Sequence, residues 1–113
     1  MEPRPVYALN VFNLLPGKED QYREYSVKIG RIINGIGGKV VAAGRDPLRR
    51  LHEDRPRRYT VMVEFPSETA FQQMLDQGEQ GDLHQLRETA TTDYIWTLYQ
   101  PWDLRAWVKQ SGA

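Results

Sequence analysis

The sequence predicts an α+β domain of the ferredoxin-like type, a four-stranded antiparallel sheet with two helices on one face. Three observations lead to this fold. Apolar residues alternate with period two in four short segments, and they recur every three to four residues in two longer ones. Proline and glycine separate these segments. The segments follow the order strand, helix, strand, strand, helix, strand, which right-handed crossovers fold into a ferredoxin-like βαββαβ sheet.

The first strand and helix are expected over residues 6–36. Residues 6–15 alternate with apolar side chains on both faces, so both faces of this strand must be covered. Pro16 and Gly17 end the strand. From Lys18 onward the spacing changes to that of one helical face. Its apolar members are Tyr22, Tyr25, Ile29, Ile32, Ile33 and Ile36. A glycine cluster, Gly35, Gly37 and Gly38, ends the helix because glycine adopts the left-handed cap conformation freely.

The remaining elements are expected in the order strand, strand, helix, strand. We place the strands at residues 39–44, with a possible continuation to residue 52, at 59–65 and at 94–99. Ser67 is a favourable N-cap for the second helix. Gly78 and Gly81 interrupt the apolar face of that helix, which resumes at Leu83.

Length and composition limit the function. A chain of 113 residues is one domain, with an expected core at about residues 6–100 and a packing tail over 101–113. Fifteen basic residues balance fifteen acidic ones, so the basic excess of a nucleic-acid-binding protein is missing. The chain has no cysteine, which excludes disulfides and thiol chemistry and fits the cytoplasm best. No signal peptide or membrane span is expected.

Two helices leave one face of the sheet open. We expect this face to carry Met62, Trp96 or Ile95, and Ala8 with Phe12, or the neighbours of these residues. An apolar face of this size is a sticky patch in water, and the simplest cover is the same face of a second copy. The sequence therefore predicts a two-fold homodimer. The tail, with Trp102, Leu104 and Trp107, is expected to pack against the body or the partner.

Several short motifs are spread over roughly residues 7–98. They are Tyr22-Arg23-Glu24-Tyr25, Gly37-Gly38-Lys39-Val40-Val41-Ala42, Val63-Glu64-Phe65-Pro66-Ser67, Ala70-Phe71 and Leu83-His84-Gln85-Leu86-Arg87. Together they resemble a bacterial family of domains of unknown function in the dimeric α+β barrel superfamily. The resemblance implies the fold and the dimer but no established reaction. The superfamily includes monooxygenases, lactone isomerases, haem-handling enzymes and ligand-binding regulators, so the fold does not imply the function.

Histidine is the one side chain that titrates near neutrality without perturbation, and it occurs at His52 and His84. Either could be a general base. The alternatives are a solvated turn for His52 and a half-exposed helical histidine with ion-paired neighbours for His84. Two distant histidines without thiols do not supply the three or four ligands that a metal needs. We therefore expect no metal and no cofactor.

Polar residues inside apolar strands are the other catalytic candidates. Asn10 interrupts the first strand and could bond a substrate carbonyl or enolate, or alternatively the backbone. Glu64 lies in the third strand, where a buried carboxylate is costly unless paired. It either pairs with an arginine across the dimer or serves as an acid or base.

Aromatic and basic residues are the candidates for ligand binding. Tyr22, Tyr25 and Trp96 would form flat walls for a planar organic molecule, with ordinary core packing as the alternative. Arg87 follows His84 by three positions and would hold an anionic group.

These residues lead to two hypotheses of different class. The first is a cofactor-independent enzyme of isomerase, cyclase or monooxygenase type, which transfers a proton on a planar oxygenated molecule. In it Asn10 polarises an oxygen and a histidine shuttles the proton. The alternative is a non-catalytic dimer that binds a small molecule or is purely structural. A pocket with polar groups around a histidine favours the enzyme, and a space filled by Tyr and Trp favours the structural dimer.

Overall fold

The computed structural model describes residues 4–51, 57–79 and 83–110. The elements follow in the order β1 (Val6–Leu14), α1 (Glu19–Gly35), β2 (Lys39–Arg45), β3 (Tyr59–Phe65), α2 (Glu68–Glu79), α3 (Leu83–Ala90), β4 (Thr91–Tyr99) and α4 (Leu104–Gln110). The strands form one antiparallel sheet in the order β2-β3-β1-β4. This is the predicted ferredoxin-like topology.

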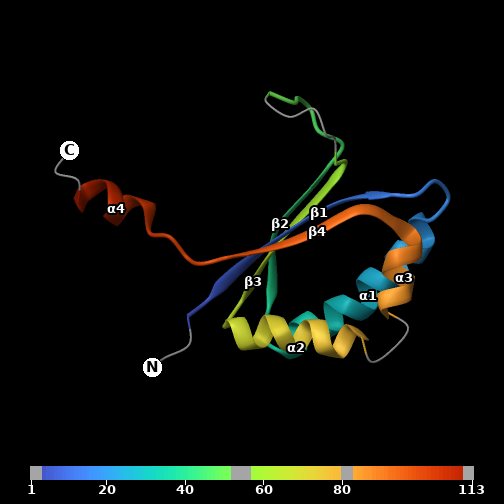
Figure 1. Ribbon diagram of the computed structural model, residues 1–113, viewed down its shortest axis with the longest axis horizontal. Helices are drawn as coiled ribbons and strands as arrows, with labels where there is room; N and C mark the ends of the chain where they lie inside the picture. The colour runs from blue at the N-terminus through green and yellow to red at the C-terminus, as the bar shows by residue number, and fades with distance from the viewer. Residues whose placement is uncertain (1–3, 52–56, 80–82, 111–113) are drawn as a thin grey trace.

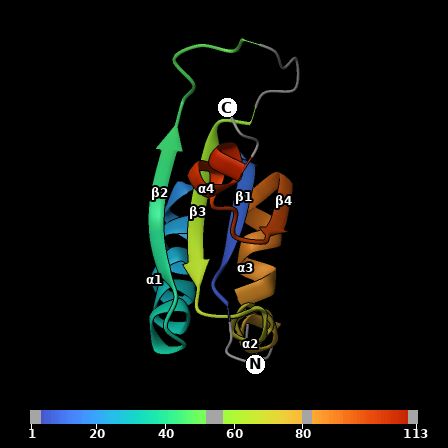
Figure 2. The ribbon, with the colours of Figure 1, turned by 90° about the vertical axis from the view of Figure 1, so that its left-hand side faces the viewer.

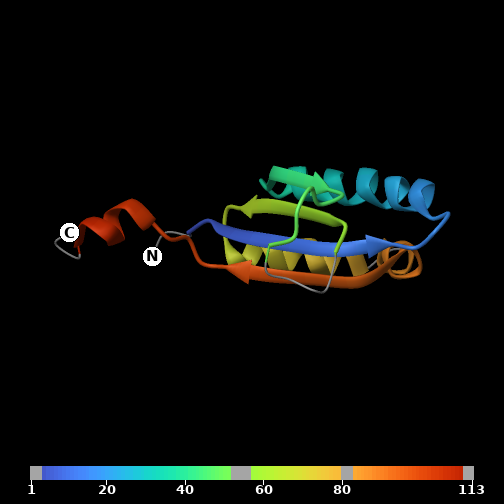
Figure 3. The same ribbon diagram turned by 90° about the horizontal axis from the view of Figure 1, so that it is seen from above.

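Three helices cover one face of the sheet. Figure 1 shows α1, α2 and α3 together on one side, and in Figure 2 α1 and α3 lie behind the strands, with α2 seen end-on below them. Figure 3 shows α4 beyond the end of β4, well away from this layer. In Figures 1 and 2, α4 projects on the side of the uncovered face. The described part of the tail thus lies apart from the helical layer, and its packing against the body or a partner stays a prediction.

Local sequence explains most of the element ends. Gly37 has a φ of +84° and ends α1, where Gly38 N–H donates to the Ile33 carbonyl at 2.8 Å. The Ser67 side chain accepts a hydrogen bond from Ala70 N–H at 3.1 Å and caps α2, as the sequence predicts. Asp103 caps α4 in the same way, by accepting from Ala106 N–H at 3.0 Å.

The strand register corrects one expectation about the two faces of the sheet. Asn10 of β1 lies opposite both Val61 of β3 and Trp96 of β4, so these three side chains share one face. Ala8 and Phe12 share it as well, and both are buried against the helices. Of the alternatives that the sequence left open for the other face, Met62 and Ile95 do lie there, as do the neighbours of Ala8 and Phe12 in place of these two residues themselves. The open face thus carries Leu9, Val11, Met62, Ile95 and Tyr99.

The strand ends also differ in places. β4 begins at Thr91, three residues earlier than predicted, and its register with β1 shifts between Val11 and Asn13. Asp93 has a φ of +54° at this irregularity. The alternating pattern is lost there, which explains why the sequence did not reveal the extension. The possible continuation of the second strand to residue 52 is not formed, because β2 ends at Arg45.

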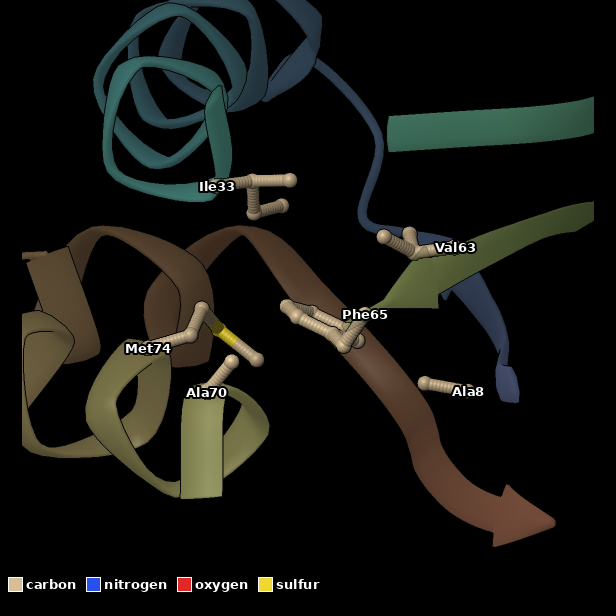
Figure 4. Close-up of a cluster of buried hydrophobic side chains, with 6 residues drawn as sticks. All are labelled: Ala8, Ile33, Val63, Phe65, Ala70 and Met74. Carbon is tan, nitrogen blue, oxygen red and sulfur yellow. The ribbon is translucent and has the colours of Figure 1, made fainter. Parts of the chain in front are cut away.

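The core lies between the sheet and the junction of α1 with α2. Figure 4 shows Ile33 of α1 and Met74 of α2 pointing toward Val63 and Phe65 of β3. Ala8 and Ala70 complete this buried cluster. The space left between α1 and the sheet lies farther along the helix.

Candidate functional site

A cavity of about 260 Å³ lies between α1 and the helix-facing side of the sheet. Its walls come from α1 and from all four strands, and we call it the Asn10 cavity. The lining residues are Asn10, Tyr22, Tyr25, Ser26, Ile29, Gly30, Ile33, Val40, Ala43, Val61, Val63, Tyr94 and Trp96. The structure thus brings Asn10, Tyr22, Tyr25 and Trp96, four of the residues singled out from the sequence, into one cavity.

Asn10 is the buried polar group of this cavity. It lies on β1, one of the two central strands, and the residue is only 3% exposed. The amide Nδ2 donates a hydrogen bond to the Tyr94 hydroxyl at 3.2 Å. The amide Oδ1 has no hydrogen-bond partner among the residues that the structure describes. A buried acceptor without a partner is destabilising and therefore calls for a donor.

Two tyrosine hydroxyls lie beside this amide. The hydroxyl oxygens of Tyr25 and Tyr94 are 3.5 Å apart. Burial raises the pKa of Tyr94 far above its usual value of 10, and the neighbouring Tyr25 adds to this rise. Burial likewise raises the pKa of Tyr22. The hydroxyls of Tyr22 and Tyr94 therefore keep their protons at neutral pH and can donate hydrogen bonds.

Stacked and tilted rings surround the polar groups. The Phe12 ring contacts those of Tyr22 and Tyr94, with centroids 4.9 and 5.5 Å apart. The Trp96 ring lies edge-on to Tyr94 at 6.3 Å. A hollow of about 360 Å³ adjoins the cavity at Tyr22, and Phe12 and Tyr59, whose rings stack on each other, also line it. Flat walls of this kind suit a planar ligand.

A second cavity of about 180 Å³ lies among α1, α2, α3 and β4. We call it the Arg87 cavity. It is lined by Tyr25, Ile29, Met74, Leu75, Gly78, Glu79, Leu83, His84, Arg87 and Trp96. Tyr25, Ile29 and Trp96 line both cavities, so these three side chains form the wall between them.

His84 is held at both ring nitrogens. Arg87 Nη2 lies 3.0 Å from Nδ1, and the Glu88 carboxylate lies 3.1 Å from Nε2. Guanidinium groups only donate, so Nδ1 accepts and Nε2 carries the proton that is donated to Glu88. His84 lines the Arg87 cavity and not the Asn10 cavity.

The other two candidate acid–base residues lie elsewhere. Glu64 pairs with Tyr7 across β1 and β3, on the open face and away from both cavities. Its carboxylate lies 3.3 Å from Lys39 Nζ in the same chain. His52 falls outside the described residues. No carboxylate or imidazole lines the Asn10 cavity within residues 4–51, 57–79 and 83–110.

Tyr94 is a site residue that the sequence did not reveal. Tyr94 is not among the aromatic candidates singled out from the sequence, yet its hydroxyl joins Asn10 to Tyr25. The strand irregularity next to it hides which face it occupies. Tyr94 lies two residues before Trp96, so the alternation of a strand places both side chains on the same face. This spacing is the signal that could have identified Tyr94 as a site residue.

The chain matches one family of domains in sequence and several solved structures in fold. Residues 7–99 match the model of a domain of unknown function, DUF1330. The RPA0582 protein of unknown function from Rhodopseudomonas palustris is similar at 24% identity over 88% of this chain and 84% of that one, with a TM-score of 0.75. No curated protein matches significantly.

Two more distant structures share the architecture. SnoaB, a cofactor-independent oxygenase from Streptomyces nogalater, is 15% identical over 88% of this chain and 95% of that one, with a TM-score of 0.61. A dimeric ferredoxin-like protein of unknown function from Thermobifida fusca is 12% identical over 88% and 92%, with a TM-score of 0.59. At these identities the likeness shows the fold alone. Within the described part of the chain, no helix has the length and apolarity to cross a bilayer.

Proposed function

The chain belongs to the DUF1330 family, and we propose that it binds a small planar organic molecule with a hydroxyl group in the Asn10 cavity. The observation that carries this proposal is the Asn10 Oδ1 atom, buried and without a partner among the described residues. A ligand hydroxyl would donate to it and satisfy it.

The cavity limits the size and shape of the ligand. Its volume of about 260 Å³ lies just below the range of roughly 300–1,000 Å³ for drug-sized ligands, which favours one or two rings. Its apolar walls include Ile29, Ile33 and Val63. An organic ligand buries its own apolar surface against these walls, which a cluster of waters cannot do.

The polar groups favour a hydroxyl over a carbonyl. A hydroxyl can donate to Asn10 Oδ1 and at the same time accept from the protonated hydroxyl of Tyr25 or Tyr94. A carbonyl only accepts and would leave Asn10 Oδ1 unsatisfied. Phenols and enols combine this hydroxyl with a planar frame.

A cofactor-independent enzyme acting on the same molecule is the second candidate. The paired hydroxyls of Tyr25 and Tyr94, 3.5 Å apart, favour it, because such donors stabilise the oxyanion of an enolate. Isomerisation, cyclisation and oxygen addition all proceed through such an anion. The general base of this reaction has no counterpart among the described residues that line the cavity, so binding is better supported than catalysis.

Calorimetry with matched two-ring ligands tests the binding proposal. We expect 2-naphthol to bind and 2-methoxynaphthalene, which lacks the donor, to bind roughly fivefold more weakly or worse. Asn10→Leu should abolish this difference, and Asn34→Leu, at an exposed site on α1, should preserve it. Equal affinities of the wild-type chain for the two ligands, or no binding of either, would overturn the proposal. Product formation from an enolisable ligand, followed by mass spectrometry, would favour the enzyme.

We also propose that the open face of the sheet pairs with a second copy of the chain. Leu9, Val11 and Met62 lie on this face, and Ile95 and Tyr99 on β4 are exposed there. Projection of α4 on the same side supports a partner, because Trp102 and Trp107 are 64% and 58% exposed. Light scattering at low micromolar concentration should give twice the mass of one chain. The mass of a single chain at every concentration would contradict the dimer.

A further inference from the structure

We infer that the ligand of the Asn10 cavity also carries a carboxylate, which binds Arg87 in the neighbouring cavity. This inference rests on the proposed function and adds the chemical class of the ligand. It makes the ligand a planar hydroxylated carboxylic acid, such as a phenolic acid or an enolised keto acid.

Arg87 is a largely buried cation with little compensating charge. Its side chain is only 18% exposed. Its Nη2 lies 3.0 Å from His84 Nδ1. Among the described residues, the carboxylate within ion-pairing distance is that of Glu88, at 3.8 Å. Glu88 is 59% exposed and already accepts from His84. A buried charge without close pairing is costly, and a ligand carboxylate would match the guanidinium fork.

Arg87 is linked to the Asn10 cavity through Tyr94. The guanidinium carbon lies 4.7 Å from the centre of the Tyr94 ring, and the hydroxyl of the same ring accepts from Asn10. One tyrosine thus contacts the polar groups of both cavities. The positive charge of Arg87 also acts against the rise in the pKa of Tyr94, so its field extends to that hydroxyl.

The position of the cavities matches a two-part ligand. The wall between them consists of Tyr25 and Ile29 from α1 and Trp96 from β4. A ligand that reaches both must pass between the helix side chains and the Trp96 indole, and a planar ring is suited to that position. Its hydroxyl then meets Asn10 and its carboxylate meets Arg87.

Glu79 opposes the binding of an anion. It lines the Arg87 cavity from the end of α2, and its negative charge would repel a carboxylate. The inference therefore makes two predictions of opposite sign. Removal of the charge of Arg87 should weaken binding of the acid, and removal of the charge of Glu79 should strengthen it.

The test compares phenols with their matched carboxylates by calorimetry at low salt. The pairs are 2-naphthol with 6-hydroxy-2-naphthoate, and the shorter 4-vinylphenol with 4-hydroxycinnamate. We expect the acid of at least one pair to bind the wild-type chain roughly tenfold tighter or more, with a gain that shrinks at high salt. Arg87→Gln should remove this gain and keep phenol binding, and Glu79→Gln should increase it.

The outcomes separate this inference from the proposed function. Phenols that bind as tightly as both acids would overturn the carboxylate site and leave the proposed function standing. Failure of all four ligands to bind would overturn the proposed function as well. A carboxylate gain that survives Arg87→Gln would place the anion elsewhere and also contradict the inference. If Arg87→Gln does not fold, the ligand pairs on the wild-type chain and on Glu79→Gln decide the question.

Discussion

Replacement of Asn10 by leucine should stabilise the protein while it abolishes the preference for ligands that carry a hydroxyl group. The amide is 3% exposed, and its Oδ1 has no partner among the described residues. Most substitutions at so buried a position are destabilising. The opposite sign is expected here because the wild-type side chain is adapted to a ligand that the free protein lacks.

The magnitude follows from two opposing contributions. An unsatisfied buried acceptor costs about 1–3 kcal/mol, and the lost hydrogen bond from Asn10 Nδ2 to Tyr94 contributes about 0.5–1.5 kcal/mol. Tyr94 keeps its contact with Tyr25. The adjoining cavity accommodates the larger leucine side chain. The net gain is roughly 1 kcal/mol, or about 4 °C in Tm for a domain of this size.

Thermal unfolding followed by circular dichroism measures this change, with guanidinium unfolding as a second measurement. Asn34→Leu is the matched control, because Asn34 is exposed on α1, and it should change stability by less than about 0.5 kcal/mol. A Tm of Asn10→Leu several degrees below that of the wild type would show that the amide is fully satisfied in the free protein. That result would refute the reasoning from the unpartnered oxygen.

Three further predictions concern packing, pH and the tail. Gly38→Ala should destabilise the fold by about 1–3 kcal/mol in a denaturant titration, because the added Cβ would lie 2.7 Å from the Ile33 side chain. Gly35→Ala is the control, since the space around its Cβ is open. The raised pKa of Tyr94 makes the native state hold its proton where the unfolded chain loses it. The contribution of Tyr94 to the unfolding free energy should therefore be constant below about pH 10 and fall above it, and Tyr94→Phe should reduce this fall. Truncation after Pro101 should weaken dimerisation or lower the Tm. A truncated chain that is still a dimer and has an unchanged Tm would show that the tail has no packing role.

The fold was predictable because its signals are local. The period-two segments of β1 and β3 and the period-three-to-four face of α1 each lie within a short stretch of chain. The structure confirms the topology and the family resemblance. The start of β4 was harder to predict, because the irregularity near Asp93 breaks the alternation of apolar residues. The helix α4 was missed, since seven residues carry too little periodic signal.

The candidate site was only partly predictable. Asn10 was recognisable as a polar residue in an apolar strand, and the structure shows it buried beside the predicted aromatic residues. Its partner Tyr94 is 84 residues away in the chain, and no local pattern reports such a pairing. The environment of His84 likewise depends on the rotamers of Arg87 and Glu88, which hold both of its ring nitrogens.

By itself, the sequence determined the order of strands and helices, because the spacing of apolar residues is a property of each segment alone. Only the tertiary structure decided which face each strand residue occupies, since the register between β1, β3 and β4 is set by pairing across the chain. That register places Asn10, Tyr25 and Tyr94 around one cavity and sends Glu64 to the opposite face. Chemistry at the site depends on such convergence over a few ångströms, and convergence arises only when distant segments pack together.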